Sequence, residues 1–255
     1  MRLATLIKDR EIWLHLGWRD LRIQYGRSRL APLWSIVNLS VSVLGLVLAQ
    51  GILVGNIDFN LTASKLAVSL WIWYFFSAFL NECSTLFESE RRVLLNSHID
   101  ENVLLFKLLW KHLVNSLIPV PVIITILSFS RVIHWTGVWS LTSVLILFSL
   151  CLLLPGLLLA RLSVRHPNLR GVVTPAIQMM FFFSPVIWSP NPEIQISQLA
   201  VEVNPLAWVL VAAKEAAGDN LEGTNFLPRV AILSCLLVAL YALAANQLSS
   251  VKDRL

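Results

Sequence analysis

Charged residues are scarce in this sequence: they make up only 14% of the 255 residues, whereas 56% are hydrophobic. Soluble domains carry about 25% charged residues, so this shortage argues against an ordinary water-soluble fold. The mean hydropathy of +0.71 points in the same direction. The composition therefore predicts an integral membrane protein.

The sequence also lacks the residue patterns of most enzymes. It contains no G-x-x-x-x-G-K-[ST] phosphate-binding loop, so it cannot hydrolyse ATP by that device. Its three cysteines, Cys83, Cys151 and Cys235, are far apart in apolar surroundings, without the spacing of a metal site or a disulfide framework. Among the acidic residues only Glu82 approaches the interior of a hydrophobic run, and the histidines fall at edges or in loops. We therefore expect no catalytic residue, no metal and no cofactor in this chain.

Long hydrophobic runs are present instead. A hydrocarbon core of about 30 Å needs roughly 20 apolar residues in a helix. Six runs approach or exceed that length, at about residues 33–54, 66–87, 112–130, 138–160, 172–188 and 227–247. The sequence thus predicts an all-α integral membrane protein with six transmembrane helices, in a single domain over residues 31–255.

The distribution of Lys and Arg predicts the orientation of these helices. Short cytoplasmic loops retain Lys and Arg. Most of the 20 basic residues fall in the N-terminal segment, in the loops after spans two and four, and in the C-terminal tail. Both termini are therefore expected to be cytoplasmic. Contact with anionic lipid accounts for the net charge of +5, so membrane lipid is an expected partner and nucleic acid is not.

Residues 1–30 differ from the spans and predict an amphipathic helix lying in the headgroup plane. Apolar residues recur there at helical spacing on one face, which consists of Ile7, Leu14, Trp18, Leu21 and Tyr25. Whether this helix only anchors the chain or also contacts a partner stays open at this point. The candidates for an interface role are Arg19, Arg22, Tyr25 and Arg27.

The last outer connection, residues 189–226, contains two apolar stretches that are each too short to cross a membrane. Asn204 and Pro205 separate them, and proline ends one helix and can start the next. We expect a re-entrant periplasmic helical hairpin between the fifth and sixth spans, with an amphipathic surface loop as the alternative. The candidates for a periplasmic gate are Asn204, Pro205 and Trp208.

Four short motifs resemble those of a known family. The stretch R-D-L-R-I-Q-Y-G-R-S-R-L-A-P-L-W at residues 19–34 resembles the start of the first span in ABC-2 type permeases that export polysaccharides. F-F-S-P-V-I at residues 182–187 and N-P-L at residues 204–206 are similar to later motifs of that family, as is the loop at residues 161–170. Ala31 replaces the family's glycine in the first motif. The motifs occur in the family's order and cover nearly the whole chain.

The resemblance implies a permease subunit of an ATP-driven exporter in the inner membrane. Such a subunit would form a homodimer and bind two copies of a separate P-loop ATPase, which would hold ATP and Mg. The implied cargo is a polyprenyl-linked polysaccharide, with O-antigen as the first expectation. The alternatives are a permease for a capsule, a teichoic acid, a drug or a lipid, or an enzyme acting on polyprenyl lipids. The loop at residues 88–102 would couple to the ATPase, and its docking candidates are Glu88, Glu90, Arg91 and Arg92.

Aromatic residues are concentrated near spans one, two and five, which line the channel in the family. Aromatic rings can stack on the C–H faces of sugars without a fixed hydrogen-bond pattern, which suits a sliding polymer. Contact with lipid or packing in the core is the alternative for each ring. The channel-lining candidates are Trp34, Phe75, Phe76, Phe79, Phe181, Phe182, Phe183 and Trp188.

Overall fold

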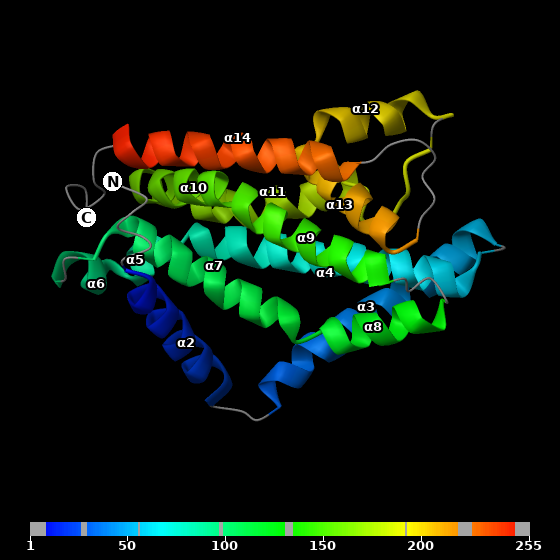
Figure 1. Ribbon diagram of the computed structural model, residues 1–255, viewed down its shortest axis with the longest axis horizontal. Helices are drawn as coiled ribbons and strands as arrows, with labels where there is room; N and C mark the ends of the chain where they lie inside the picture. The colour runs from blue at the N-terminus through cyan, green and yellow to red at the C-terminus, as the bar shows by residue number, and fades with distance from the viewer. Residues whose placement is uncertain are drawn as a thin grey trace.

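The computed structural model describes residues 9–26, 30–55, 57–96, 99–130, 135–191, 193–218 and 226–247. Every secondary-structure element within these ranges is a helix, which confirms the all-α prediction for this part of the chain. The elements are α2 (Arg10–Gly26), α3 (Ala31–Val54), α4 (Phe59–Cys83), α5 (Leu86–Ser89), α6 (Arg91–Asn96), α7 (Glu101–Leu117), α8 (Val120–Phe129), α9 (Trp135–Cys151), α10 (Leu153–Arg165), the 3-10 helix η1 (Pro167–Leu169), α11 (Arg170–Phe183), α12 (Gln195–Val203), α13 (Pro205–Ala216) and α14 (Phe226–Gln247). In Figure 1 α4, α9, α10 and α14 run roughly along the longest axis of the molecule, and α3 crosses that direction at a slant.

The described chain contains four to six candidate membrane spans. Four segments are long and apolar enough by themselves: Pro32–Val54, Phe59–Cys83, Trp139–Arg165 and Phe226–Ala244. Two bent pairs also qualify if each pair is counted as one span, namely α7 with α8, bent by 41°, and α12 with α13, bent by 106°. A multi-pass membrane protein is supported, while the count of six stays a prediction.

The predicted third and fifth spans differ from the helices observed. The third was expected to begin at residue 112, and the helix that contains this position, α7, already begins at Glu101. The fifth was expected over residues 172–188, but α11 ends at Phe183 after 14 residues. At 1.5 Å per residue a helix of that length covers only about 21 Å, less than the thickness of a bilayer core.

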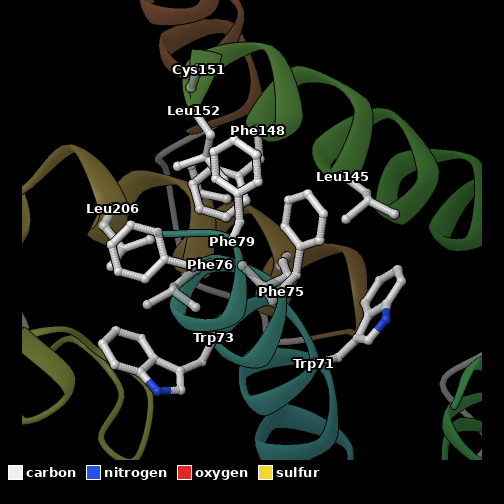
Figure 2. Packing of buried hydrophobic residues seen from close by; sticks show 14 of the residues in the cluster. Trp71, Trp73, Phe75, Phe76, Phe79, Leu145, Phe148, Cys151, Leu152 and Leu206 are labelled. Atoms are coloured by element: carbon white, nitrogen blue, oxygen red, sulfur yellow. The ribbon is translucent and has the colours of Figure 1, made fainter. Parts of the chain in front are cut away.

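Helix α4 is the centre of the packing. In its apolar window 72% of the residues are buried, compared with 17% in α3 and 22% in α14, so those two helices lie on the periphery. Aromatic side chains of α4 pack against α9 and α10, as the cluster in Figure 2 shows. Phe76 stacks on Phe148 with ring centroids 6.0 Å apart. Gly156 lets α10 approach this cluster, because a Cβ at that position would lie 2.8 Å from Phe79.

Helix α2 packs along α7 at a slant, in the lower left of Figure 1. Its packed face contains Trp13, Gly17 and Leu21, and a Cβ on Gly17 would lie 2.8 Å from Trp110. The predicted apolar face included Trp18, but that side chain is 49% exposed. Leu21 of the predicted face is buried and Leu14 and Tyr25 are half-buried, so contact of this face with the membrane surface stays a prediction.

Candidate functional site

A groove of about 790 Å³ lies between α3, α4 and α11, and we call it the α3/α4/α11 groove. No charged side chain lines it among the described residues. Its lining consists of Ser42, Gly45, Leu46, Leu70, Trp73, Tyr74, Ser77, Asn81, Thr174, Ile177, Gln178, Phe181 and Phe182. A mixture of hydroxyl, amide and aromatic groups therefore faces one space in the middle of the molecule.

The polar part of this lining is arranged by helical periodicity. Ser77 and Asn81 are four residues apart on α4, as Thr174 and Gln178 are on α11, so each pair shares one helix face. The Thr174 hydroxyl donates to Asn81 Oδ1 at 2.7 Å and joins the two helices. Thr174 and Gln178 are exposed in the single subunit. Because polar groups facing acyl chains are costly, this face is better suited to water, a ligand or a second subunit than to lipid.

The aromatic part of the lining comes from α4 and α11. Trp73 contacts Phe181 edge-on, with ring centroids 5.1 Å apart, and Phe181 in turn contacts Phe182 at 5.5 Å. Phe182 is 70% exposed, so its ring stands open at the edge of the groove. On the opposite side, the Tyr74 hydroxyl donates to Ser42 Oγ at 2.7 Å and links α4 to α3.

The structure separates the predicted channel aromatics into groups. Phe181 and Phe182 line the groove. Phe75, Phe76 and Phe79 are buried in the core around α4. Trp34 and Phe183 are exposed but do not line the groove, and Trp188 is half-buried in the turn that follows α11.

Side chains from α3 and from the α12–α13 hairpin hold the turn that follows α11. Gln50 Nε2 on α3 donates to the carbonyl oxygen of Ile187 at 2.6 Å. Lys214 on α13 is only 1% exposed, and its Nζ donates to the carbonyl oxygen of Trp188 at 2.7 Å. Asn204 Nδ2 donates to Ser184 Oγ at 2.9 Å. The hairpin and the end of α11 are thus cross-linked by hydrogen bonds.

The three gate candidates lie where α12 and α13 meet. Asn204 caps α13 by accepting from the backbone N–H of Leu206 at 3.0 Å, and Pro205 is the first residue of the helix, as helix-capping rules favour. Pro205 is exposed, while Trp208 is half-buried with an indole N–H that has no hydrogen-bond partner in the described structure. The two short helices are present and meet at an angle of 106°, while a re-entrant hairpin in the membrane stays a prediction.

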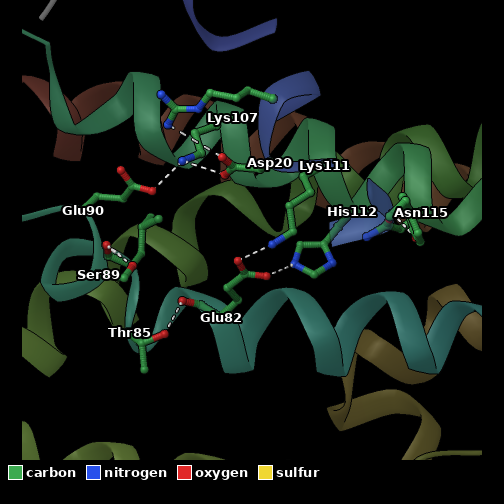
Figure 3. Close-up of polar contacts among 12 residues, drawn as sticks. Asp20, Glu82, Thr85, Ser89, Glu90, Lys107, Lys111, His112 and Asn115 are labelled. Atoms are coloured by element: carbon green, nitrogen blue, oxygen red, sulfur yellow. Dashed lines mark hydrogen bonds and ion pairs between the residues drawn. The ribbon is translucent and has the colours of Figure 1, made fainter. Parts of the chain in front are cut away.

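A network of charged side chains runs along α7, as Figure 3 shows, and we call it the α7 charge network. Lys107 Nζ lies 2.7 Å from Asp20 Oδ2 on α2 and 2.5 Å from Glu90 Oε1 in the turn after α5. One turn further on, Lys111 forms an ion pair with Glu82 of α4. His112 Nε2 lies 2.9 Å from the other carboxylate oxygen of Glu82.

This network brings together ionisable residues that the sequence analysis placed at the edges of hydrophobic runs or outside them. His112 is buried within α7 rather than placed at an edge or in a loop. No local pattern marks this cluster, because Glu82 lies 29 residues before Lys111 and 30 before His112, and only helix packing brings them together. Glu101 and Asn102 extend the polar contacts of α7, to Arg161 on α10 at 3.1 Å and to Tyr241 on α14 at 2.7 Å.

The predicted docking residues lie at the end of the molecule that carries α5 and α6 (Figure 1). Glu88 is exposed and forms an ion pair with Arg170 at the start of α11. Glu90 is half-buried and turns inward to Lys107. Arg91 and Arg92 are both exposed on α6. Three of the four side chains are thus accessible from solvent, and Glu90 joins the loop to the α7 charge network.

The interface-helix candidates occupy two different surroundings. Arg19 and Arg22 are exposed on α2. Tyr25 is half-buried and its hydroxyl donates to Asn115 Oδ1 on α7 at 2.7 Å. Loss of water around this phenol raises its pKa above the ordinary value. Arg27 lies outside the described residues.

Sequence reasoning missed the polar residues of the groove and both buried lysines, Lys107 and Lys214. A usable signal was present for the groove, since Ser77 with Asn81 and Thr174 with Gln178 are polar pairs at helical spacing inside apolar runs. Within the described ranges no group of three or more His, Cys, Asp or Glu side chains is placed to hold a metal ion. The expectation that the chain needs no cofactor stays a prediction.

Comparison with known proteins adds one match. The family model described as "ABC-2 type transporter" matches residues 12–216, a region that includes the groove, the α7 charge network and the α12–α13 hairpin. No curated protein matches the chain.

Proposed function

Because the chain belongs to the ABC-2 type transporter family, we propose that it is the membrane permease subunit of an ATP-driven exporter of a lipid-linked polysaccharide. Permeases of this family generally dimerise and work with ATPase partners. We take the working unit to be a homodimer with two separate P-loop ATPase subunits, which bind ATP and Mg. O-antigen is the cargo we propose first. Family membership is equally consistent with a capsule, a teichoic acid, a drug or a lipid.

The composition of the α3/α4/α11 groove is the observation that supports a sugar polymer. Its lining combines uncharged hydrogen-bonding groups with exposed aromatic faces. Hydroxyl and amide groups can exchange hydrogen bonds with sugar hydroxyls, and rings such as Phe182 can cover apolar sugar faces. A lipid cargo would not require amide and hydroxyl groups in the lining, and a charged cargo would require side chains of opposite charge there.

The exposure of α11 supports a dimer. Gln178 and Phe182 lie on the lining of the groove yet are exposed in one subunit, so a single chain forms an open trough. In our proposal the same face of a second copy closes the trough and completes the conduit. Phe76 and Phe79 then act as packing residues behind the lining, since both are buried against α9 and α10.

The surface of α5 and α6 supports an ATPase docking site. Arg91 and Arg92 are exposed next to Glu88, and Glu90 connects the same loop to Lys107 on α7. A displacement of the loop would therefore be transmitted to α7 and, through Asp20, to α2. α14 ends at the same end of the molecule (Figure 1), in keeping with the predicted cytoplasmic side.

Adjacent phenylalanines provide a matched test of this proposal. Phe182 and Phe183 are similarly exposed, at 70% and 67%, but only Phe182 lines the groove. The permease, purified with its ATPase partner in lipid nanodiscs, is assayed for ATP hydrolysis stimulated by lipid-linked glycan. We expect Phe182→Ala to reduce the stimulation severalfold and Phe183→Ala to leave it close to wild type.

Three outcomes would contradict the proposal. If no ATPase co-purifies with the chain, an ATP-driven exporter is excluded. Equal effects of Phe182→Ala and Phe183→Ala would show that the groove is not part of the transport path. Chemical conversion of the polyprenyl lipid without ATP would support a membrane enzyme instead.

A further inference from the structure

A second cavity, of about 660 Å³, lies beneath α2, between α2, α3, α4 and α7, and we call it the α2 cavity. Its volume is within the range of about 300–1,000 Å³ that is typical of small-molecule sites. The deep part is formed by side chains that are themselves buried, namely Leu39, Trp71, Phe75, His112 and Ser116. The rim includes Gln24 and Asn38, which are exposed. The cavity is thus a defined pocket that opens to the surface.

The lining combines aromatic faces with unused hydrogen-bonding groups. Trp71, Tyr74 and Phe75 supply rings from α4. Gln24, Ser35 and Asn38 also line the cavity, and their side chains make no hydrogen bond within the described part of the chain. An amide can donate and accept at the same time, so these side chains can bind neighbouring hydroxyl groups of one ligand.

The charges around the cavity disfavour an anionic ligand. Lys111 and His112 both contact Glu82, and Asp20 contacts Lys107. Both basic side chains that line the cavity in the described ranges, Lys111 and His112, therefore already face a carboxylate. A phosphate would find no free cation to pair with. A neutral ligand with many hydroxyl groups fits this environment better.

The α2 cavity adjoins the α3/α4/α11 groove. Tyr74 and Ser77 line both spaces. On α3, four small or polar residues recur at intervals of three and four on a single helix face: Ser35, Asn38, Ser42 and Gly45. The first two line the cavity and the last two line the groove. The hydrogen bond from Tyr74 to Ser42 lies at the junction between the two spaces.

We propose that the α2 cavity binds one neutral sugar unit of the glycan before the chain enters the groove. This inference rests on the proposed export of a polysaccharide. The aromatic floor covers the apolar face of the sugar ring, while Gln24, Ser35 and Asn38 bind its hydroxyl groups. Movement of Tyr74 away from Ser42 then opens the way along α3 into the groove.

Two exposed positions, one inside the cavity and one outside it, allow a direct binding test. Ala78 on α4 and Val37 on α3 are both exposed, but only Ala78, which has no assigned role in sugar binding, lines the α2 cavity. Each is replaced by cysteine in a background where the exposed Cys235 is changed to alanine, and the full-length protein in nanodiscs is labelled with a maleimide. The probes are three neutral methyl glycosides, of glucose, mannose and N-acetylglucosamine, and inorganic pyrophosphate is the anionic probe. No ATP or ATPase is present.

The expected result is protection of Ala78→Cys by at least one of the glycosides. At about ten times its Kd a ligand leaves only about one site in eleven free, so labelling should slow about tenfold. Val37→Cys should label at the same rate with and without sugar. Protection by pyrophosphate alone, no protection by any of the three glycosides, or equal protection of both cysteines would overturn the proposal. If no glycoside protects the cysteine but lipid-linked glycan still stimulates ATP hydrolysis, only the sugar site is rejected. If there is neither protection nor stimulation, the proposed function is rejected as well.

Discussion

Lys107→Met tests how α2 is held to the rest of the subunit. The Lys107 side chain is 3% exposed, and its ammonium group lies between the carboxylates of Asp20 and Glu90, which are 23% and 19% exposed. Methionine keeps an unbranched apolar chain of similar length in place. The substitution therefore removes the cation and little packing. Glu90 is left without this counterion, and Asp20 keeps the exposed Arg19 at 3.8 Å.

The size of the effect follows from this geometry. Removing one partner of a buried ion pair costs about 3–5 kcal/mol. Both carboxylates keep some contact with water, which lowers the cost to about 2–3 kcal/mol. Since about 1.4 kcal/mol corresponds to a factor of ten, detachment of α2 should become roughly 30- to 150-fold more favourable. The contacts of Trp13 with Phe106 and Trp110 remain, so we expect local opening rather than unfolding of the whole subunit.

Hydrogen exchange measured by mass spectrometry in nanodiscs reports this opening. Amides of α2 should exchange faster in Lys107→Met by roughly the same 30- to 150-fold, while the amides of α4 keep their wild-type protection. The triple variant Asp20→Asn, Glu90→Gln, Lys107→Met should return α2 close to wild-type exchange, because it leaves no unpaired buried charge. Unchanged exchange in the single variant, or equally fast exchange in the triple variant, would show that packing and not the ion pairs holds α2.

Two further substitutions test the packing of the helices. Gly17→Ala places a Cβ 2.8 Å from Trp110 and should destabilise the subunit by about 1–3 kcal/mol. At the control position Gly26 nothing lies within 4 Å, so Gly26→Ala should leave the melting temperature unchanged or raise it slightly. Equal melting temperatures of the two variants would contradict the close contact of α2 with α7. Tyr241→Phe removes the buried hydrogen bond to Asn102 and should lower the free energy of unfolding by about 1 kcal/mol. The melting temperature in detergent should fall accordingly. A wild-type melting temperature would mean that this bond between α14 and α7 contributes nothing to stability.

Most helix positions could be predicted because hydrophobicity along the chain is a local property. The run at residues 33–54 corresponds to α3 and the run at residues 227–247 corresponds to α14, each within about two residues. Only the last part of α7 falls within a predicted run, because its charged residues were taken as the boundary of that run. Their partners, such as Glu82 for Lys111, come from another helix, so no local pattern reveals that the charges are compensated.

The lining of the groove shows a second limit of sequence reasoning. Between residues 71 and 76, α4 carries apolar side chains on every side of the helix. Hydrophobic periodicity therefore cannot tell which ring packs inward and which faces a ligand. The structure buries Phe76 in the core, places Phe75 on the floor of the α2 cavity and leaves Phe182 of α11 exposed at the groove. The polar residues of the same faces carried more information, because hydroxyls and amides at helical spacing mark a face that lipid disfavours.

The sequence by itself determined that this is a helical membrane protein related to transport permeases, because span length, charge content and short motifs can be read along one dimension. Only the tertiary structure decided which residues act together. Lys107 joins residues from α2 and from the turn after α5, and Asn102 meets Tyr241 across 139 positions of the chain. Such pairs depend on how the helices pack and on which faces they turn toward one another. The separation of two residues along the sequence does not predict whether they come into contact. The groove and the α2 cavity could therefore be identified only from the tertiary structure.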